Sequence, residues 1–215
     1  MIQIITVLEP SHSKVTVKRS EFCAYISPAE SESAAYEFID TVRKMHYKAN
    51  HHPYAFIVGK DEISKKNSDD GEPSQTAGRP ILGILEAAGI TDAVLVCARY
   101  FGGTKLGAGG LARAYSRSAS EAVKSAVLVS KQLCAVVRLS VKYSSWDRLR
   151  SYISKRNLKV ISTDFNEQAS AEAAVPLSEL QTVLEELADL TNGDIHAQKI
   201  SEEYIEKIIA GENVQ

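Results

Sequence analysis

A glycine-rich, basic segment is the part of this sequence whose residue types point most directly to chemistry. It runs from Arg99 to Tyr115 and reads RYFGGTKLGAGGLARAY, and five of the nine residues from Gly102 to Gly110 are glycine. No acidic residue lies between Asp92 and Glu121. Glycines let an anion approach the backbone, and the free amides of a helix N-terminus attract negative charge. A phosphate site, or a tight turn with close helix packing, would each explain this composition.

The established phosphate-binding motifs fit this segment poorly. A P-loop places glycine before Lys-Ser or Lys-Thr, whereas Gly103-Thr104-Lys105 has a different order. Residues 107–112 match the pattern GxGxxA, but no acidic residue follows at the spacing that dinucleotide-binding folds use. The residues predicted to bind phosphate or nucleic acid are Arg79, Arg99, Lys105, Gly107, Gly109, Gly110 and Arg113.

An acidic, turn-rich segment, NSDDGEPSQTAGRP, precedes the glycine-rich one at residues 67–80. Its three carboxylates, Asp69, Asp70 and Glu72, crowd around an Asp-Gly turn and could hold Mg²⁺ through oxygen ligands. Short acidic turns are commonly solvated, so we predict no metal and keep Mg²⁺ as the alternative. Ser74, Thr76 and the amide of Gly78 are expected to cap the helix that follows.

Two adjacent histidines, His51 and His52, stand before a predicted strand. Neighbouring side chains in an extended chain point in opposite directions, so the pair is poorly placed to share one ion. We interpret His51 as a hydrogen-bonding or ligand-contacting residue. The other possible ligand contacts belong to the acidic segment: Asp69, Asp70, Glu72, Ser74 and Thr76. The sequence has no GxSxG motif and no CxxC pair, so neither a hydrolase nucleophile nor a zinc site is predicted. No catalytic residue is assigned.

The elements around these segments predict an α/β domain over residues 1–130. Strands are expected near residues 3–8 and 14–26, at 54–59 and at 92–101, and the last of these is the most apolar. Helices are expected at residues 28–47, 80–88 and 110–127 from their apolar spacing. The polar stretch from Lys60 to Pro80 reads as a loop.

After a break near residue 130 the pattern begins again. A strand at 134–143, a helix at 144–157, strands at 160–165 and 169–176, a helix at 177–193 and a strand from 194 follow one another. This βαββαβ order is typical of the ferredoxin-like arrangement. We therefore predict an α+β protein with a second, ferredoxin-like domain at residues 134–208.

Several segments together resemble one known family. SDDGEPSQTAGRPIL at 68–82 and ARYFGGTKLGAGGLARAY at 98–115 are similar to motifs of the IMPACT family, and the two-domain length resembles its bacterial YigZ-like branch. KRSEF at 18–22 and HHPYAF at 51–56 support the resemblance. Two residues depart from the expected pattern. Gln75 stands where a small residue, usually glycine, is expected, and Pro53 follows the pair of histidines.

The resemblance implies a fold and a field of function. The first domain would be a two-layer α/β fold similar to the second domain of ribosomal small-subunit protein five. The second would be similar to the last domain of elongation factor G. Eukaryotic members of the family regulate translation by competing for the activator of an amino-acid-starvation kinase, a partner that does not carry over to bacteria.

Three functions stay open on the sequence. The first is translation-associated binding of RNA or the ribosome without catalysis, which we take as the main hypothesis. The second is a small-molecule enzyme or nucleotide binder that uses the same loop, with Mg²⁺ on the acidic segment. The third is a protein-binding regulatory module.

Composition limits where such a protein would work. The formal net charge is -2, so any nucleic-acid contact must be local. The three cysteines are scattered, which suits a reducing compartment. No leader is evident, and no apolar run approaches the ~20 residues needed to cross a bilayer. We expect a cytoplasmic protein without a membrane partner.

Overall fold

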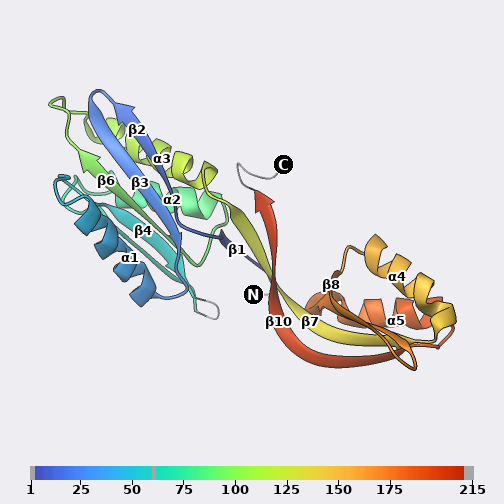
Figure 1. The fold of residues 1–215 in the computed structure, drawn as a ribbon. Helices are drawn as coiled ribbons and strands as arrows, with labels where there is room; N and C mark the ends of the chain where they lie inside the picture. Colours follow the sequence, from blue (N-terminus) through green and yellow to red (C-terminus); the bar gives the residue numbers. More distant parts are fainter. Residues whose placement is uncertain (1–2, 60–61, 211–215) are drawn as a thin grey trace. The chain divides into compact units, whose positions relative to one another are not determined.

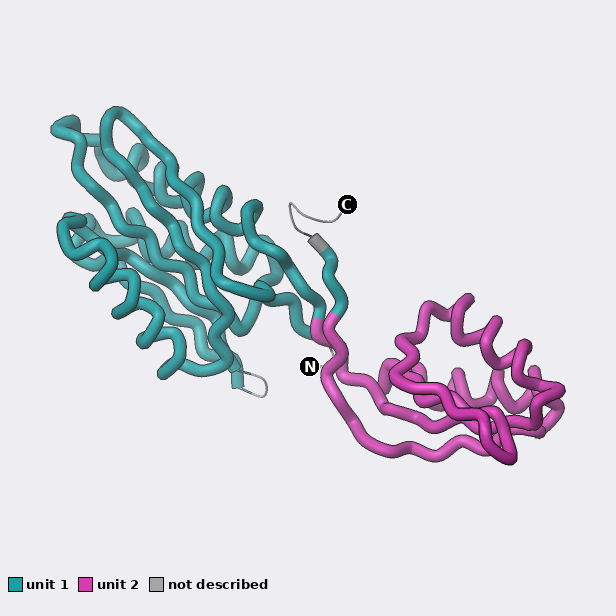
Figure 2. Tube along the Cα trace, in the orientation of Figure 1, with its two compact units in different colours: residues 1, 3–130, 207–215 teal, residues 2, 131–206 magenta. Residues whose placement is uncertain are grey.

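The computed structural model describes residues 3–59 and 62–210. The chain divides into two compact units, which Figure 2 draws in different colours. Of the described residues, unit 1 holds 3–130 and 207–210, and unit 2 holds 131–206. The protein therefore has the two-domain α+β architecture expected from the sequence.

Unit 1 is built from a five-stranded sheet and three helices (Figure 1). The sheet has the order β2-β3-β6-β4-β5, and each neighbouring pair is antiparallel. The elements of unit 1 are β1 (Gln3–Val7), β2 (Ser11–Val17), β3 (Ser20–Pro28), α1 (Glu32–Met45), β4 (Tyr54–Val58), β5 (Ser64–Ser68), α2 (Gly78–Ala87), β6 (Ala93–Tyr100) and α3 (Ala108–Lys124).

Helices cover both faces of this sheet, so the prediction of two layers is wrong for unit 1. Successive residues of β6 point to opposite faces: Val94 and Val96 pack in a core with α1, whereas Leu95 and Cys97 pack in a core with α2 and α3. β6 is buried along almost its whole length for this reason. The continuous apolar run that made it the clearest strand in the sequence is what a strand between two helical layers requires.

The predicted elements agree with the structure except at two places: the single strand expected at residues 14–26 is a hairpin of β2 and β3, and the polar stretch at 60–80 is not entirely a loop. The Ser31 side chain accepts a hydrogen bond from the Ala34 amide and starts α1, within the helix expected at 28–47. The segment predicted as a loop contains β5, which pairs with β4 at the edge of the sheet. Its polar residues face solvent there, so no apolar pattern marks the strand. Lys60 and Asp61 of that predicted loop lie outside the described residues.

Unit 2 has the βαββαβ order that the sequence predicts. Within its sheet β9 lies between β7 and β8, and β10 also pairs with β7. Helices α4 and α5 share an apolar core with β7 and β9. The elements are β7 (Leu128–Val141), α4 (Trp146–Lys155), β8 (Lys159–Phe165), β9 (Ala169–Pro176), α5 (Leu180–Leu190) and β10 (His196–Ala210), with short 3-10 turns at Tyr143–Ser145 and Leu177–Glu179.

The cysteines and the helices complete the description. All three cysteines are free, and burial raises the pKa of the Cys97 thiol to about 12, so this thiol stays protonated near neutral pH. None of the helices in the described part of the chain combines the length and apolar character that crossing a bilayer requires.

A close backbone contact joins the β2–β3 turn to the loop before α3. Lys18 and Arg19 form the turn with positive φ angles of 45° and 69°, which suits the right-handed twist of a hairpin. The Gly102 amide donates to Ser20 Oγ over 3.1 Å. A Cβ atom on Gly102 would stand 2.0 Å from the carbonyl carbon of Arg19. Glycine at 102 is therefore required by packing.

We expect Gly102→Ala to destabilise the protein by roughly 1–3 kcal/mol, because the methyl group must displace the backbone of the turn. Gly83→Ala is the matched control: nothing lies within 4 Å of the added Cβ, and the position is inside α2. Alanine there should stabilise by about 0.5–1 kcal/mol. Urea denaturation of both variants measures the difference, and equal midpoints would show that the turn and the loop do not constrain each other.

Candidate functional site

A buried ion pair connects the acidic segment to the glycine-rich one. Arg99 Nη1 on β6 donates to Glu72 Oε1 over 2.6 Å, and their side chains are only 7% and 3% exposed. The Tyr115 hydroxyl on α3 donates to the same oxygen over 2.7 Å. Burial raises the pKa of Tyr115, and the bond to Glu72 adds to the effect, so this hydroxyl remains a donor. Three distant segments are thus held at one carboxylate.

The guanidinium of Arg99 also lies between two aromatic rings. Its central carbon is 5.6 Å from the ring centroid of Phe22 and 5.7 Å from that of Phe101. Arg99 Nε is buried without a hydrogen-bond partner among the described residues. Arg99 was predicted to contact phosphate, but the structure gives it a carboxylate partner inside the protein. Its contribution to a surface site is therefore indirect.

Asp69 caps helix α2, in place of the predicted capping by Ser74 and Thr76. Asp69 Oδ1 accepts hydrogen bonds from the amides of Ala77 and Gly78, each at 2.9 Å. The Thr76 hydroxyl donates to the carbonyl of Pro73, and no side chain of α2's own N-cap residue contributes. A carboxylate suits this position because it complements both the free amides and the helix dipole.

The backbone conformation at Gln75 explains why a small residue, usually glycine, is expected at this position. Its φ angle is +61°, a region that glycine adopts at little cost and other residues adopt at some cost. Asp69 Oδ2 holds the Gln75 amide over 2.7 Å and so supports this conformation. The position therefore favours a small residue for backbone reasons.

Asp70 and the histidines form a second bonded cluster. Asp70 pairs with Arg43 over 3.2 Å, and its other oxygen accepts from the His52 amide over 2.6 Å. His51 Nδ1 is 2.8 Å from the Asp70 carbonyl, which can only accept, so Nδ1 carries the proton. All three carboxylates of the acidic segment are thus bonded to protein groups. Within the described residues, no three or more His, Cys, Asp or Glu side chains gather in a way that could hold a metal ion.

The N-terminus of α3 is arranged differently from that of α2. Gly107 precedes the helix with a φ angle of +71°, and no side chain of this N-cap residue bonds to the helix. The amides of the first turn, which include those of Gly109 and Gly110, have no acceptor within an α-helix. This end of α3 is therefore open to solvent or to an anion.

A groove of about 500 Å³ lies beside this open helix end. Its walls are mostly apolar, with a smaller share of polar surface. The lining residues are Asn50, His51, Glu72, Pro73, Arg99, Phe101, Lys105, Leu106, Gly107, Ala108 and Leu111. The structure thus brings together five of the predicted site residues around one cavity: His51, Glu72, Arg99, Lys105 and Gly107.

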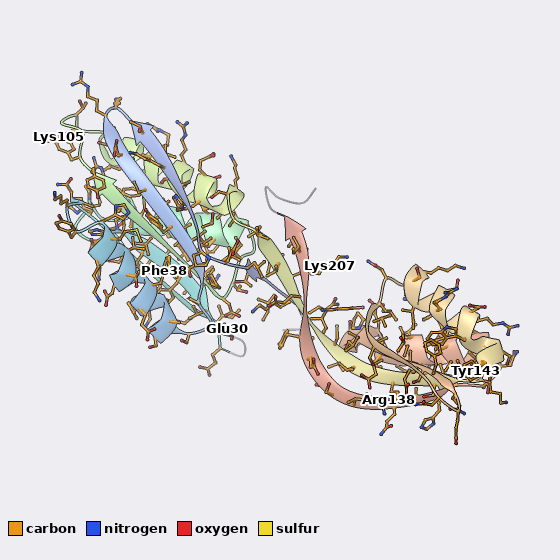
Figure 3. All side chains as sticks on the ribbon, viewed as in Figure 1. Glu30, Phe38, Lys105, Arg138, Tyr143 and Lys207 are labelled. Carbon is orange, nitrogen blue, oxygen red and sulfur yellow. The ribbon has the colours of Figure 1, made fainter. Side chains whose placement is uncertain are left out.

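Two of the four predicted cations, Arg79 and Arg113, lie outside this groove. Lys105 lines it and lies on the loop before α3 (Figure 3). Arg113 instead lines a depression of about 270 Å³ together with Lys18 and Arg117. Arg79 pairs with Glu86 along α2 over 3.2 Å and lines neither cavity.

Five exposed cations surround the start of α3, and we call them the basic surface. Its members are Lys18, Arg19, Lys105, Arg113 and Arg117. Among the described residues, no carboxylate forms an ion pair with any of them, whereas Lys14, Arg43, Lys65, Lys66, Arg79 and Arg99 of the same unit are all paired.

Sequence reasoning missed three members of the basic surface. Lys18 and Arg19 belong to the KRSEF segment, which was used only to support the family resemblance. Arg117 lies in the same acid-free interval as Lys105. The positive charges are visible in the sequence. The contact between Arg19 and Gly102, however, joins positions 83 residues apart and could not be anticipated from their spacing.

Comparison with known proteins shows the family. Residues 18–123 match the Impact N-terminal domain, and residues 139–194 match a domain of unknown function (DUF1949). The IMPACT family member YvyE of Bacillus subtilis is 32% identical over 95% of this chain and 94% of its own length. YigZ of Escherichia coli, a further IMPACT family member, is 29% identical over 86% of this chain and 92% of its own length.

A solved structure supports the same assignment. The crystal structure of a hypothetical protein, 28% identical in sequence, superposes with a TM-score of 0.60 over 94% of this chain and all of its own. The chain belongs to the IMPACT family, and the predicted likeness to its YigZ-like members is confirmed.

We expect Glu72→Ala to destabilise the protein by about 3–5 kcal/mol, because it leaves the Arg99 guanidinium buried without its carboxylate. The double variant Glu72→Leu/Arg99→Met should recover much of this loss, since it removes both charges. Glu86→Ala removes a more exposed carboxylate and should have little effect. Urea denaturation followed by circular dichroism gives the comparison. A double variant no more stable than Glu72→Ala would contradict the assigned role of the pair.

Proposed function

We propose that this protein is a non-catalytic, translation-associated protein that binds RNA, free or in the ribosome, through the basic surface. The observation that carries the proposal is the set of five exposed cations around the open N-terminus of α3, with which no carboxylate of the described residues forms an ion pair. Lysine and arginine contacts to phosphates supply most of the sequence-independent affinity for nucleic acid.

The position of the basic surface suits a phosphate chain better than a single ion. Its residues come from the β2–β3 turn, the loop before α3 and the first turns of α3, so they form an extended surface. The amides of Gly109 and Gly110 add partial positive charge within it. The protein is acidic overall, so binding that depends on this surface must be local and strongly dependent on salt.

Family membership gives the field of function. The sequence resemblance implies a likeness of the two domains to a ribosomal protein domain and to a domain of elongation factor G, and that expectation favours a role near the ribosome. The strand order β10-β7-β9-β8 of unit 2 is the order expected for such a ferredoxin-like module. This support is by analogy of fold, so the basic surface has to be tested directly.

The test is RNA binding across a salt series with a triple variant, Lys105→Ala/Arg113→Ala/Arg117→Ala. We expect weaker binding and a log–log salt slope shallower by about 2, since each phosphate contact to a single strand contributes about 0.7. Binding to purified ribosomes should weaken in parallel. Fluorescence anisotropy with labelled RNA and ribosome sedimentation measure the two effects.

The control variant removes the same charge elsewhere. Lys44→Ala/Lys48→Ala/Arg148→Ala changes three exposed cations outside the basic surface and should keep the wild-type slope. Equal loss in the two triple variants would mean that net charge alone governs binding. Wild-type protein that binds neither RNA nor ribosomes at moderate salt would overturn the proposed function.

A further inference from the structure

We propose that the groove beside α3 receives one unpaired nucleobase of the RNA strand whose phosphates lie on the basic surface. The inference rests on the proposed RNA binding and adds a preference for single-stranded RNA. It is carried by the size of the groove, by an exposed aromatic residue in its wall and by polar groups in its lining whose bonding capacity the described residues do not use.

The groove and the basic surface are adjacent. Leu106 lines the groove on one side and the depression formed by Lys18, Arg113 and Arg117 on the other. Lys105, a member of the basic surface, stands at the groove itself. A nucleotide whose phosphate contacts these cations can therefore direct its base into the groove. A volume of about 500 Å³ is in the range of small-ligand pockets and exceeds the need of one base.

Phe101 provides the surface on which a base can stack. Its ring is 48% exposed although it lines the groove, and the Arg99 guanidinium lies 5.7 Å from its centroid. Asn50 Oδ1 accepts a hydrogen bond from the Phe101 amide over 2.8 Å and fixes the backbone there. Stacking on aromatic side chains is the usual way in which proteins hold unpaired bases.

Polar groups that line the groove have bonding capacity that the described part of the protein does not use. Glu72 Oε1 accepts both bonds from Arg99 and Tyr115, and Oε2 has no partner among the described residues. His51 donates from Nδ1, and its other ring nitrogen, Nε2, has no partner among the described residues. The Asn50 amide nitrogen has no acceptor among the described residues. Acceptors and a donor side by side suit the edge of a base, which carries both.

The observations favour a base within a strand over a free nucleotide. A free nucleotide carries its charge at one phosphate group, for which Lys105 and the end of α3 would suffice. Lys18, Arg19, Arg113 and Arg117 would then remain unexplained beside the site. A strand occupies the groove with one base and the basic surface with its neighbouring phosphates, so it accounts for both features.

The experiment compares the full chain with Phe101→Ala, Phe101→Tyr and the control Tyr47→Ala, an exposed aromatic residue outside the groove. Each protein is titrated into a short single-stranded RNA and a duplex of the same sequence at several salt concentrations. We expect Phe101→Ala to weaken single-strand binding about 5- to 150-fold, the range of one lost stacking contact, without a change in salt slope. Phe101→Tyr should keep wild-type affinity.

The outcomes separate this inference from the proposed function. Loss of single-strand affinity in Phe101→Ala, with duplex binding and Tyr47→Ala unaffected, supports the base site. Equal affinity of Phe101→Ala and wild type for the single strand, with the salt slope intact, would overturn the base site and leave the proposed function standing. Mononucleotides that bind wild type but not Phe101→Ala, without any RNA binding, would overturn both and identify a free nucleotide as the occupant.

Discussion

The buried pair of Glu72 and Arg99 is the interaction on which the site in unit 1 depends. It joins the acidic segment, the central strand β6 and helix α3 at a single carboxylate oxygen that Tyr115 also contacts. A charge this deeply buried is stable only with its partner, so the pair fixes the three segments relative to one another. One buried interaction therefore fixes both the residues that line the groove and the start of α3.

The two charged segments have opposite roles. The acidic segment directs its charges inward: Asp69 caps α2, Asp70 pairs with Arg43, and Glu72 neutralises Arg99. The cations of the basic surface direct theirs outward, and no carboxylate of the described residues pairs with them. Because the carboxylates of the acidic segment are bonded within the fold, a protein of net charge -2 can present a locally positive surface.

Much of the fold could be predicted from sequence because local patterns determine it. The apolar run of β6, the small-residue face of α3 and the βαββαβ order of unit 2 are all visible in the periodicity of side chains. The third layer was missed because burial of β6 on both faces depends on where α1 packs. The role of Arg99 was also missed, because a buried pair across 27 residues leaves no mark in either segment alone.

The composition of the glycine-rich loop has two separate causes. Gly102 is needed because the backbone of the β2–β3 turn lies against it, and Gly107 is needed because the chain enters α3 with a positive φ angle. Neither requirement involves a ligand. The same close contact, however, brings Lys18 and Arg19 beside Lys105 and α3, where like charges repel one another. Backbone geometry explains Gly102 and Gly107, and the proposed binding of an external anion would offset the repulsion among the cations.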